Sequence, residues 1–132
     1  MISQFKAKAK STTSNGISSE KKVVLKEIHA LANWEANWDG YGAVPVLKTV
    51  IDNAEKVILN KVISVKYLDD VQPNPNGTVT MTWTHKGNQL CLEIGVDKIS
   101  YFADLKGDTL YSQVEDFSNG NILKLAAYVN QL

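Results

Sequence analysis

The sequence predicts an α+β domain in which an antiparallel sheet is covered on one face by helices. Residues 78–96 alternate apolar and polar side chains, which is the period of a half-buried strand. Residues 20–33 and 47–63 instead repeat apolar side chains at the spacing of a helix face. A chain of 132 residues is long enough to bury one core without a metal or a disulfide.

The N-terminal end of the chain is predicted to be a tail. Residues 1–16 are rich in Lys, Ser and Thr, and they hold few apolar groups that could offset the entropy lost on ordering. They are expected to be flexible, whereas residues 17–132 are expected to form the single α+β domain.

Two helices should open this domain. Ser19 is a good N-cap for the first, which is predicted over residues 20–33. The second is predicted over residues 47–63 and has a wide apolar face. A third helix, over residues 121–131, is expected to close the domain with its apolar residues facing inward.

An antiparallel meander of about four strands is expected between the second and third helices. Residues 69–77 hold Asp, Asn, Pro and Gly and are predicted to be a turn-rich connector, with a short strand near 65–68 left open. A strand near residues 109–115 should end the meander after a turn at Gly107.

The hairpin in the middle of the meander sets its register. A tight turn centred on Gly87 and Asn88 places Trp83 opposite Leu92, so that the apolar residues of both strands share one face. A second turn at residues 97–98 would place Tyr101 opposite Ile94 and Ile99 opposite Val96.

Charge and composition exclude several classes of function. The formal net charge is zero and every cation is Lys, which disfavours a nucleic-acid reader because two-pronged recognition of bases and phosphates is mostly the work of Arg. No apolar run approaches the length of about 18 residues that a membrane span needs, and a cytoplasmic location is expected. Cys91 is the only cysteine. No His, Cys, Asp or Glu spacing indicates a metal site, and no cofactor is expected.

The loop over residues 34–45 is one candidate site. Trp34, Trp38 and Tyr41 could stack on a sugar or a base, or they could plug the end of the core. The second interpretation is favoured, and for Trp38 and Tyr41 the two are compatible.

Two carboxylates in the same loop suggest a catalytic alternative. Glu35 and Asp39 are flanked by tryptophans, and burial against an aromatic ring can raise the pKa of one acid beside another. Asp39 before Gly40 is more simply explained as a turn former. Catalysis here remains open.

The outer face of the sheet is the other candidate site. A solvated face would not require the aromatic side chains that alternation places on it, so Phe102 and Tyr111 are candidates for binding a partner. Single exposed aromatic side chains are also common on ordinary protein surfaces, and the two interpretations stay open. The residues predicted to share this face are Thr80, Thr82, Thr84, Cys91, Glu93, Phe102 and Tyr111.

Two motifs carry a family resemblance. Residues 38–45 are W-D-G-Y-G-A-V-P, and residues 73–83 fit the pattern P-x-x-x-G-x-x-x-x-x-W. Together they resemble an uncharacterised group of small bacterial proteins with a W-D-G-Y-G-A-x-P loop, over roughly residues 33–103. The resemblance implies a bacterial or mobile-element protein of the cytoplasm and implies no catalytic residues.

These observations favour a non-enzymatic protein-binding module. It could be the antitoxin, immunity or accessory member of a bacterial gene pair, with a protein partner and no membrane or nucleic-acid partner. Homo-oligomerisation is left open. The alternative is a small carbohydrate- or nucleotide-binding protein, or an acid–base hydrolase, that uses the loop over residues 34–45.

Overall fold

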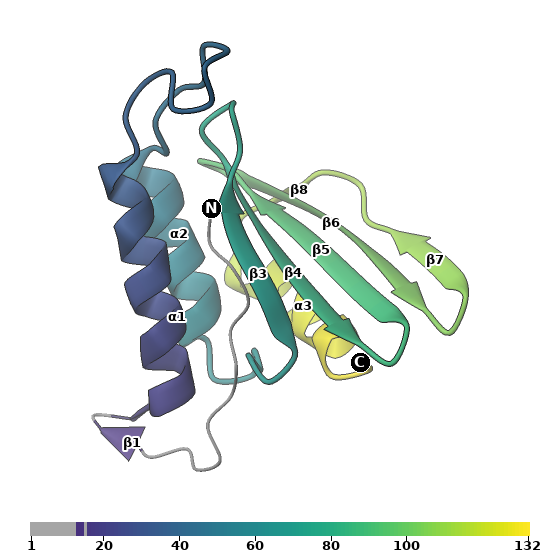
Figure 1. Ribbon diagram of the computed structural model, residues 1–132. Coiled ribbons are helices and arrows are strands. Elements are labelled where there is room, and N and C mark those ends of the chain that lie inside the picture. The colour runs from purple at the N-terminus through teal and green to yellow at the C-terminus, as the bar shows by residue number, and fades with distance from the viewer. Residues whose placement is uncertain (1–12, 15) are drawn as a thin grey trace.

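An antiparallel sheet and three α-helices make up most of the computed structural model, which describes residues 13–14 and 16–132. Helices α1 and α2 pack against each other beside the sheet, and α3 lies behind it (Figure 1). This arrangement confirms the predicted α+β class.

The helices begin and end close to their predicted bounds. They are α1 (Ser19–Ala30), which continues into the 3-10 turn η1 (Leu31–Asn33), α2 (Lys48–Leu59) and α3 (Asn119–Val129). The N-cap of α1 is Ser18 rather than Ser19, because the Ser18 hydroxyl accepts the N–H of Lys21 at 3.2 Å. Helix α2 ends earlier than predicted, since Asn60 leaves helical geometry and its side chain accepts the N–H of Val62.

The predicted tail lies mostly outside the described residues. Within them, β1 (Thr13–Ser14) pairs with β2 (Ile17–Ser18) in a small hairpin directly before α1.

The sheet has six strands rather than about four. In chain order they are β3 (Leu68–Pro73), β4 (Val79–His85), β5 (Asn88–Ile94), β6 (Lys98–Leu105), β7 (Asp108–Tyr111) and β8 (Glu115–Asp116). Strands β3 to β7 are neighbours in sequence order, and β8 pairs with β6.

Strand β3 occupies most of the predicted connector, so the connector prediction was wrong. A register shift between Leu68 and Asp70 breaks the alternation of buried and exposed residues along β3. The segment also contains two Asp residues and a Pro, which are uncommon in strands, so its composition does not indicate a strand.

The register of the central hairpin differs from the prediction by two residues. Lys86 and Gly87 form the turn, with φ of 48° and 81°, which is the pair of positive values that a type I′ two-residue hairpin turn requires. Trp83 therefore pairs with Leu90 and not with Leu92. Because side chains alternate with a period of two, this shift leaves the apolar residues of β4 and β5 on the predicted face. Val96, which was predicted to stand opposite Ile99, instead lies beyond the end of β5 and is 48% exposed.

The later turns were also displaced. Ile94 pairs with Ile99, and Tyr101 pairs with Leu92 rather than with Ile94. The strand predicted near residues 109–115 is interrupted, because the Ser112 hydroxyl accepts the N–H of Tyr101 at 3.0 Å at the end of β7. The chain then returns to pair with β6 as β8.

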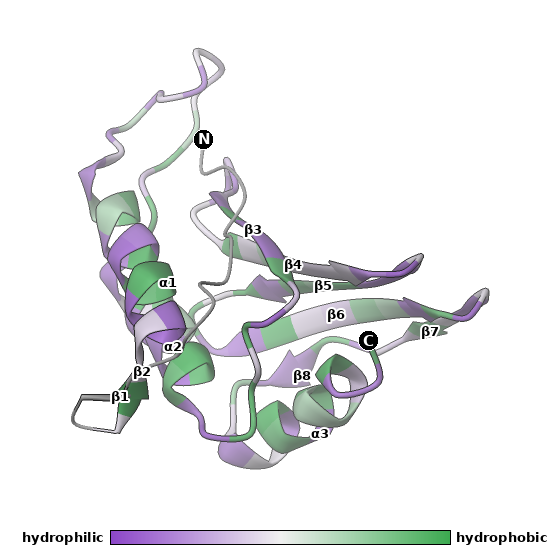
Figure 2. Cartoon of the chain, turned by 60° about the horizontal axis from the view of Figure 1, so that its bottom comes forward, coloured by the Kyte–Doolittle hydropathy of each residue, from purple (hydrophilic) through white to green (hydrophobic). Residues whose placement is uncertain are grey.

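The core lies between one face of the sheet and the helices. Trp83 is fully buried there, and its indole N–H donates to the carbonyl of Ser64 at 2.9 Å. The inward residues predicted for the last helix are buried as expected; they are Ile122, Leu125, Ala126 and Val129. Within the described residues no helix covers the opposite face of the sheet, which is its outer face (Figure 2).

Asn53 on α2 is the one buried polar residue in the described part of the chain. Its amide N–H groups donate to the carbonyls of Gly95 and Val96, at 2.9 and 2.8 Å. These two bonds attach α2 to the loop between β5 and β6. They satisfy carbonyls that the sheet cannot pair, since both residues lie beyond the end of β5.

Replacing Asn53 by Ala should lower the free energy of unfolding by about 1–3 kcal/mol, because it leaves two carbonyls without their donor. Chemical denaturation measures this loss. Thr49→Ala is the matched control, since Thr49 is exposed on the same helix and should change stability by less than about 0.5 kcal/mol. Equal effects of the two variants would contradict the role assigned to Asn53.

Candidate functional site

The loop over residues 34–45 is held by its own polar side chains. The Asp39 carboxylate accepts the N–H groups of Tyr41 and Ala43, at 2.8 and 3.1 Å. The Asn37 side chain accepts the N–H of Gly42 at 2.7 Å, and the Asn37 N–H donates to the carbonyl of Ala43 at 2.6 Å. Both side chains are therefore used to hold the shape of the loop.

The two tryptophans of this loop contact each other. Their rings are 4.9 Å apart at an angle of 86°, an edge-to-face arrangement. Trp34 packs against the core, whereas Trp38 is half-buried and donates its indole N–H to the carbonyl of Val44 at 3.2 Å. The core-plug interpretation fits Trp34, while Trp38 braces the loop.

The other two candidates of the loop point to solvent. Tyr41 is 92% exposed, so the core-plug interpretation was wrong for this residue. Glu35 is also exposed. The structure gives Asp39 a role in the backbone and gives Glu35 no burial against the tryptophans, and catalysis by this pair remains only a prediction.

The loop also contacts the turn before β4. The N–H of Val44 donates to the carbonyl of Pro75 at 2.9 Å. Gly77 has φ of 89° and lies so close that a Cβ there would be 3.1 Å from the side chain of Val44. The loop over residues 38–45 and the segment over residues 73–83 are therefore in contact, which sequence spacing alone could not show.

If Asp39 acts as a turn former, Asp39→Asn should change stability little, because the amide keeps an acceptor oxygen. Asp39→Ala should cost about 1–3 kcal/mol, since it removes both hydrogen bonds. Chemical denaturation of the two variants checks this order. A loss of similar size in both variants would show that the negative charge, rather than the acceptor geometry, is needed.

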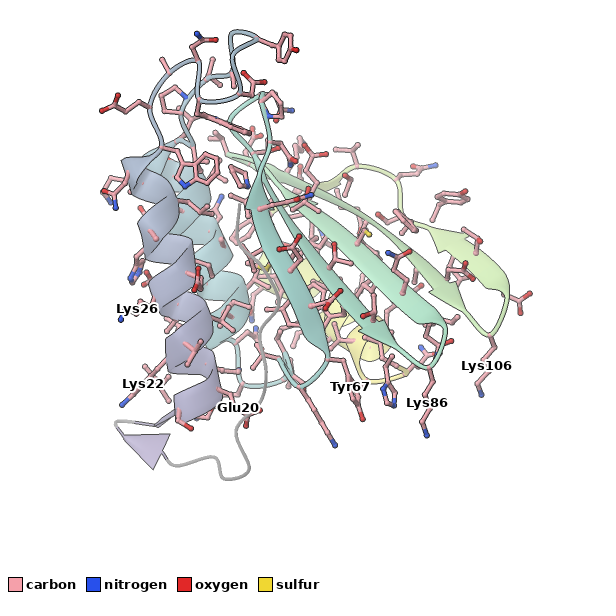
Figure 3. The ribbon with its side chains drawn as sticks, in the orientation of Figure 1. Glu20, Lys22, Lys26, Tyr67, Lys86 and Lys106 are labelled. Atoms are coloured by element: carbon pink, nitrogen blue, oxygen red, sulfur yellow. The ribbon has the colours of Figure 1, made fainter. Side chains whose placement is uncertain are left out.

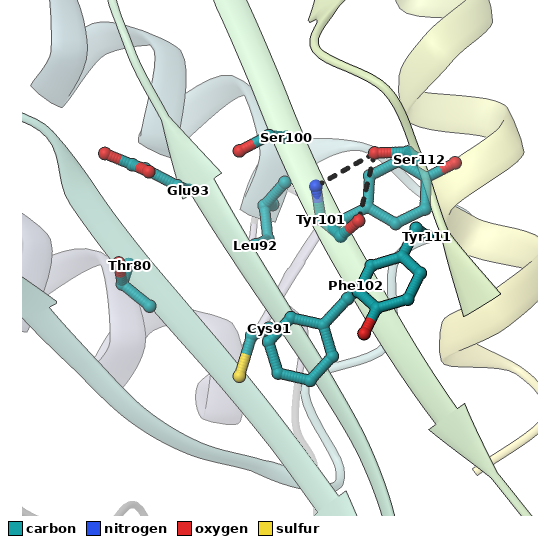
Figure 4. Close-up of a pocket in the computed structure, with 9 residues that line it drawn as sticks. All are labelled: Thr80, Cys91, Leu92, Glu93, Ser100, Tyr101, Phe102, Tyr111 and Ser112. Atoms are coloured by element: carbon teal, nitrogen blue, oxygen red, sulfur yellow. Dashed lines mark hydrogen bonds between the residues drawn. The ribbon is translucent and has the colours of Figure 1, made fainter. Parts of the chain in front are cut away.

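The second candidate site is the outer face of the sheet. Strand register places Thr80, Glu93 and Ser100 in one row across β4, β5 and β6, beside a row of Thr82, Cys91, Phe102 and Tyr111. An open hollow of about 430 Å³ lies on this face (Figure 4). It is lined by Thr80, Cys91, Leu92, Glu93, Ser100, Tyr101, Phe102, Tyr111 and Ser112.

One side of this hollow is aromatic. The rings of Phe102 and Tyr111 are 6.5 Å apart, and Tyr111 is 80% exposed. The Ser112 hydroxyl bridges the N–H and the carbonyl of Tyr101, both at 3.0 Å, as Figure 4 shows. This bridge fixes the end of β7 and with it the position of Tyr111.

The opposite side of the hollow is a hydrogen-bonded wall that sequence reasoning missed. The Thr78 hydroxyl contacts the Glu93 carboxylate at 2.6 Å, and Asn76 donates to the same oxygen at 3.4 Å. Asn74 donates to the hydroxyls of Thr78 and Thr80, at 3.0 and 2.8 Å. The sequence feature that could have indicated this wall is the pair Asn74 and Asn76 directly before the strand, which the prediction interpreted only as turn-forming residues.

One end of the sheet gathers aromatic and basic side chains that were not predicted as a group. Tyr67 stacks on His85 at 3.7 Å, and the Lys66 ammonium lies 5.3 Å from the Tyr67 ring. Lys86 and Lys106 extend from two hairpin tips at this same end (Figure 3). These lysines share this end of the sheet with carboxylates such as that of Asp108, which follows directly after the hairpin tip that carries Lys106.

A polar cluster joins the sheet to α3. The Lys124 ammonium contacts the Glu115 carboxylate at 2.5 Å, and the rings of Tyr101 and Tyr128 are 5.6 Å apart. Burial, and then the nearby Glu115, raise the pKa of Tyr101 to about 12. The Tyr101 hydroxyl therefore stays neutral in the folded protein well above the pH at which a free Tyr ionises.

This shift predicts a loss of stability at alkaline pH. Tyr101 in the unfolded chain releases its proton near pH 10, about two units below the folded pKa, so the unfolded state binds fewer protons between these values. The free energy of unfolding should fall as pH rises from about 10 to about 12. Denaturation of the parent and of Tyr101→Phe across this range checks it, because the variant should show the weaker dependence.

Neither a metal cluster nor a membrane span is found in the described part of the chain. Across residues 13–14 and 16–132, no three His, Cys, Asp or Glu residues are placed to hold a metal ion together. None of the helices in those residues combines the length and the apolar character needed to cross a membrane.

Comparisons of the chain with protein-family models, with curated proteins and with solved structures found no match.

Proposed function

We propose that this chain is a non-enzymatic protein-binding module that takes its partner on the outer face of the sheet. The observation that carries the proposal is an exposed Tyr111 beside Phe102 on a face that no described helix covers. Exposed aromatic side chains are enriched at the centres of protein interfaces, where they bury much area at a small cost in entropy.

The hollow gives this surface a shape and a polarity. Its volume of about 430 Å³ is enough for one or two side chains of a partner. The aromatic side would bury apolar groups, and Glu93 on the other side would accept hydrogen bonds from a donor or a cation. A partner segment that carries an apolar residue beside a basic residue would fit both sides of the hollow.

The biological setting is part of the same proposal. The resemblance of the two motifs to a bacterial group supports a bacterial or mobile-element origin, and the small size, the zero net charge and the exposed aromatic residues of the outer face support an antitoxin, immunity or accessory role in a gene pair. A single thiol, with no second cysteine to pair with, is compatible with the reducing cytoplasm.

A second candidate is supported by Tyr41. This side chain is 92% exposed on a loop that Asn37 and Asp39 hold in one shape. An aromatic ring presented in this way can stack on a sugar or a base. The loop is thus the alternative place for a carbohydrate or nucleotide ligand.

Capture of a partner from a lysate of the native host separates the two surfaces. Three baits would be compared: the parent chain, the Tyr111→Ser variant and the Tyr41→Ser variant. The two variants remove similarly exposed tyrosines, the first from the outer face and the second from the loop. The proposal expects the parent and Tyr41→Ser to retain the same protein, and Tyr111→Ser to retain at least tenfold less, as a loss of about 1.4 kcal/mol gives.

Thermal unfolding of both variants is the control, since neither residue is buried and both should fold as the parent does. Loss of the captured protein in Tyr41→Ser, with retention in Tyr111→Ser, would contradict the proposal and assign binding to the loop.

A further inference from the structure

Strand β7 is a free edge of the sheet. It pairs with β6 on one side and with no other strand of the described chain on the other side. All of its residues are exposed, including Leu110 at 41% and Tyr111 at 80%. In Figure 1 it lies at the side of the sheet away from α1 and α2.

The register shows which backbone groups of β7 face outward. The N–H of Ser112 donates to the carbonyl of Tyr101, so these two residues form a hydrogen-bonded pair. In an antiparallel ladder hydrogen-bonded pairs alternate with pairs that are not, which makes Leu110 a bonded partner of β6. The N–H and carbonyl groups of Thr109 and Tyr111 must then point away from β6 toward solvent.

The other edge of the sheet, β3, is protected against pairing. It carries Asp69 and Asp70, and a register shift interrupts it. The N–H of Asn74 bonds to the carbonyl of Thr78, so the neighbouring Pro73 occupies an outward-facing position where it offers no donor. Charges, irregular register and Pro are the features by which sheet edges avoid pairing with other chains.

Strand β7 carries fewer of these features, and its one charge is Asp108 at its first position. Its pairing with β6 shows no register shift, and its sequence from Asp108 to Tyr111 contains no Lys and no Pro. A strand edge that is regular in register and exposed is a template for a further strand.

We infer that β7 pairs with β7 of a second copy of this chain, antiparallel, about a two-fold axis at Leu110. Leu110 then faces Leu110 of the second copy, Thr109 faces Tyr111, and Asp108 faces Ser112. The outward groups of Thr109 and Tyr111 form four backbone hydrogen bonds, and the two Leu110 side chains cover each other.

The charges favour a second copy as the occupant. In this register no like charges stand opposite each other, because Asp108 meets Ser112. The formal net charge of the chain is zero, so two copies do not repel each other at long range. The pairing uses the same patch on both copies and closes on itself, and the protected β3 edge prevents growth beyond two.

The two-fold axis would run perpendicular to the sheet, so both outer faces lie on the same side of the dimer. The Tyr111 side chains are diagonal neighbours across the axis, within reach of each other. The ladder is short, which places this dimer among the small and weak specific interfaces.

Sedimentation velocity of the full chain tests the inference at concentrations from about 10 µM to about 1 mM, a range that detects weak association. The parent should shift from monomer toward dimer. Leu110→Lys places two ammonium groups on the axis and should weaken association at least tenfold. Leu123→Lys is the matched control, since Leu123 is 48% exposed on α3, and it should behave as the parent does.

A mixture tests the register itself. Leu110→Lys and Leu110→Glu should each be monomeric alone, and an equal mixture should associate more tightly than either, because Lys then faces Glu across the axis. A parent that stays monomeric to about 1 mM would overturn the inference. So would a Leu110→Lys variant that dimerises as the parent does, or a mixture that associates no better than its components.

Discussion

Burial of one face of the sheet is the constraint on which the rest of the structure depends. Three rows of apolar side chains cross the inner face, from β4 through β5 to β6. They are Val79–Ile94–Ile99, Met81–Leu92–Tyr101 and Trp83–Leu90–Ala103. All nine are buried, and each large side chain contributes about 1.5–3 kcal/mol when it leaves water. Because every second residue of these strands is buried in the core, the remaining residues face outward, and packing of the core does not constrain their identity.

Polar side chains complete the fold where this core does not reach. Asn53 attaches α2 to the loop after β5, and Asn37 with Asp39 closes the loop between the first two helices. A third set of Asn residues, before β4, orders the wall beside Glu93. Each satisfies backbone or hydroxyl groups at the end of a regular element, where the ladder bonds stop.

The sequence predicted those parts of the structure that depend on periodicity. The stripes of α1 to α3 and the alternation of β4 and β5 follow from burial alone, so the inward and outward faces were assigned correctly. Strand β3 was missed because its register shift and two Asp erase the alternation. The contact between Val44 and Pro75 joins residues far apart in the chain, and no local pattern contains it. For the candidate sites, alternation placed Phe102 and Tyr111 on one face, but it could not show that Ser112 fixes the end of β7 or that Tyr41 is exposed.

The difference of two residues between the predicted and the observed register of the central hairpin shows what selects the register of the sheet. A shift of two residues between β4 and β5 keeps every apolar side chain on the inner face, so burial hardly distinguishes the two registers. The native register is selected by the turn, where Lys86 and Gly87 both adopt positive φ. A hairpin closes within about 1–10 µs, well before a core of distant contacts is complete. The turn alone distinguishes the two registers, so the choice between them does not require the contacts that α2 and α3 make with the inner face.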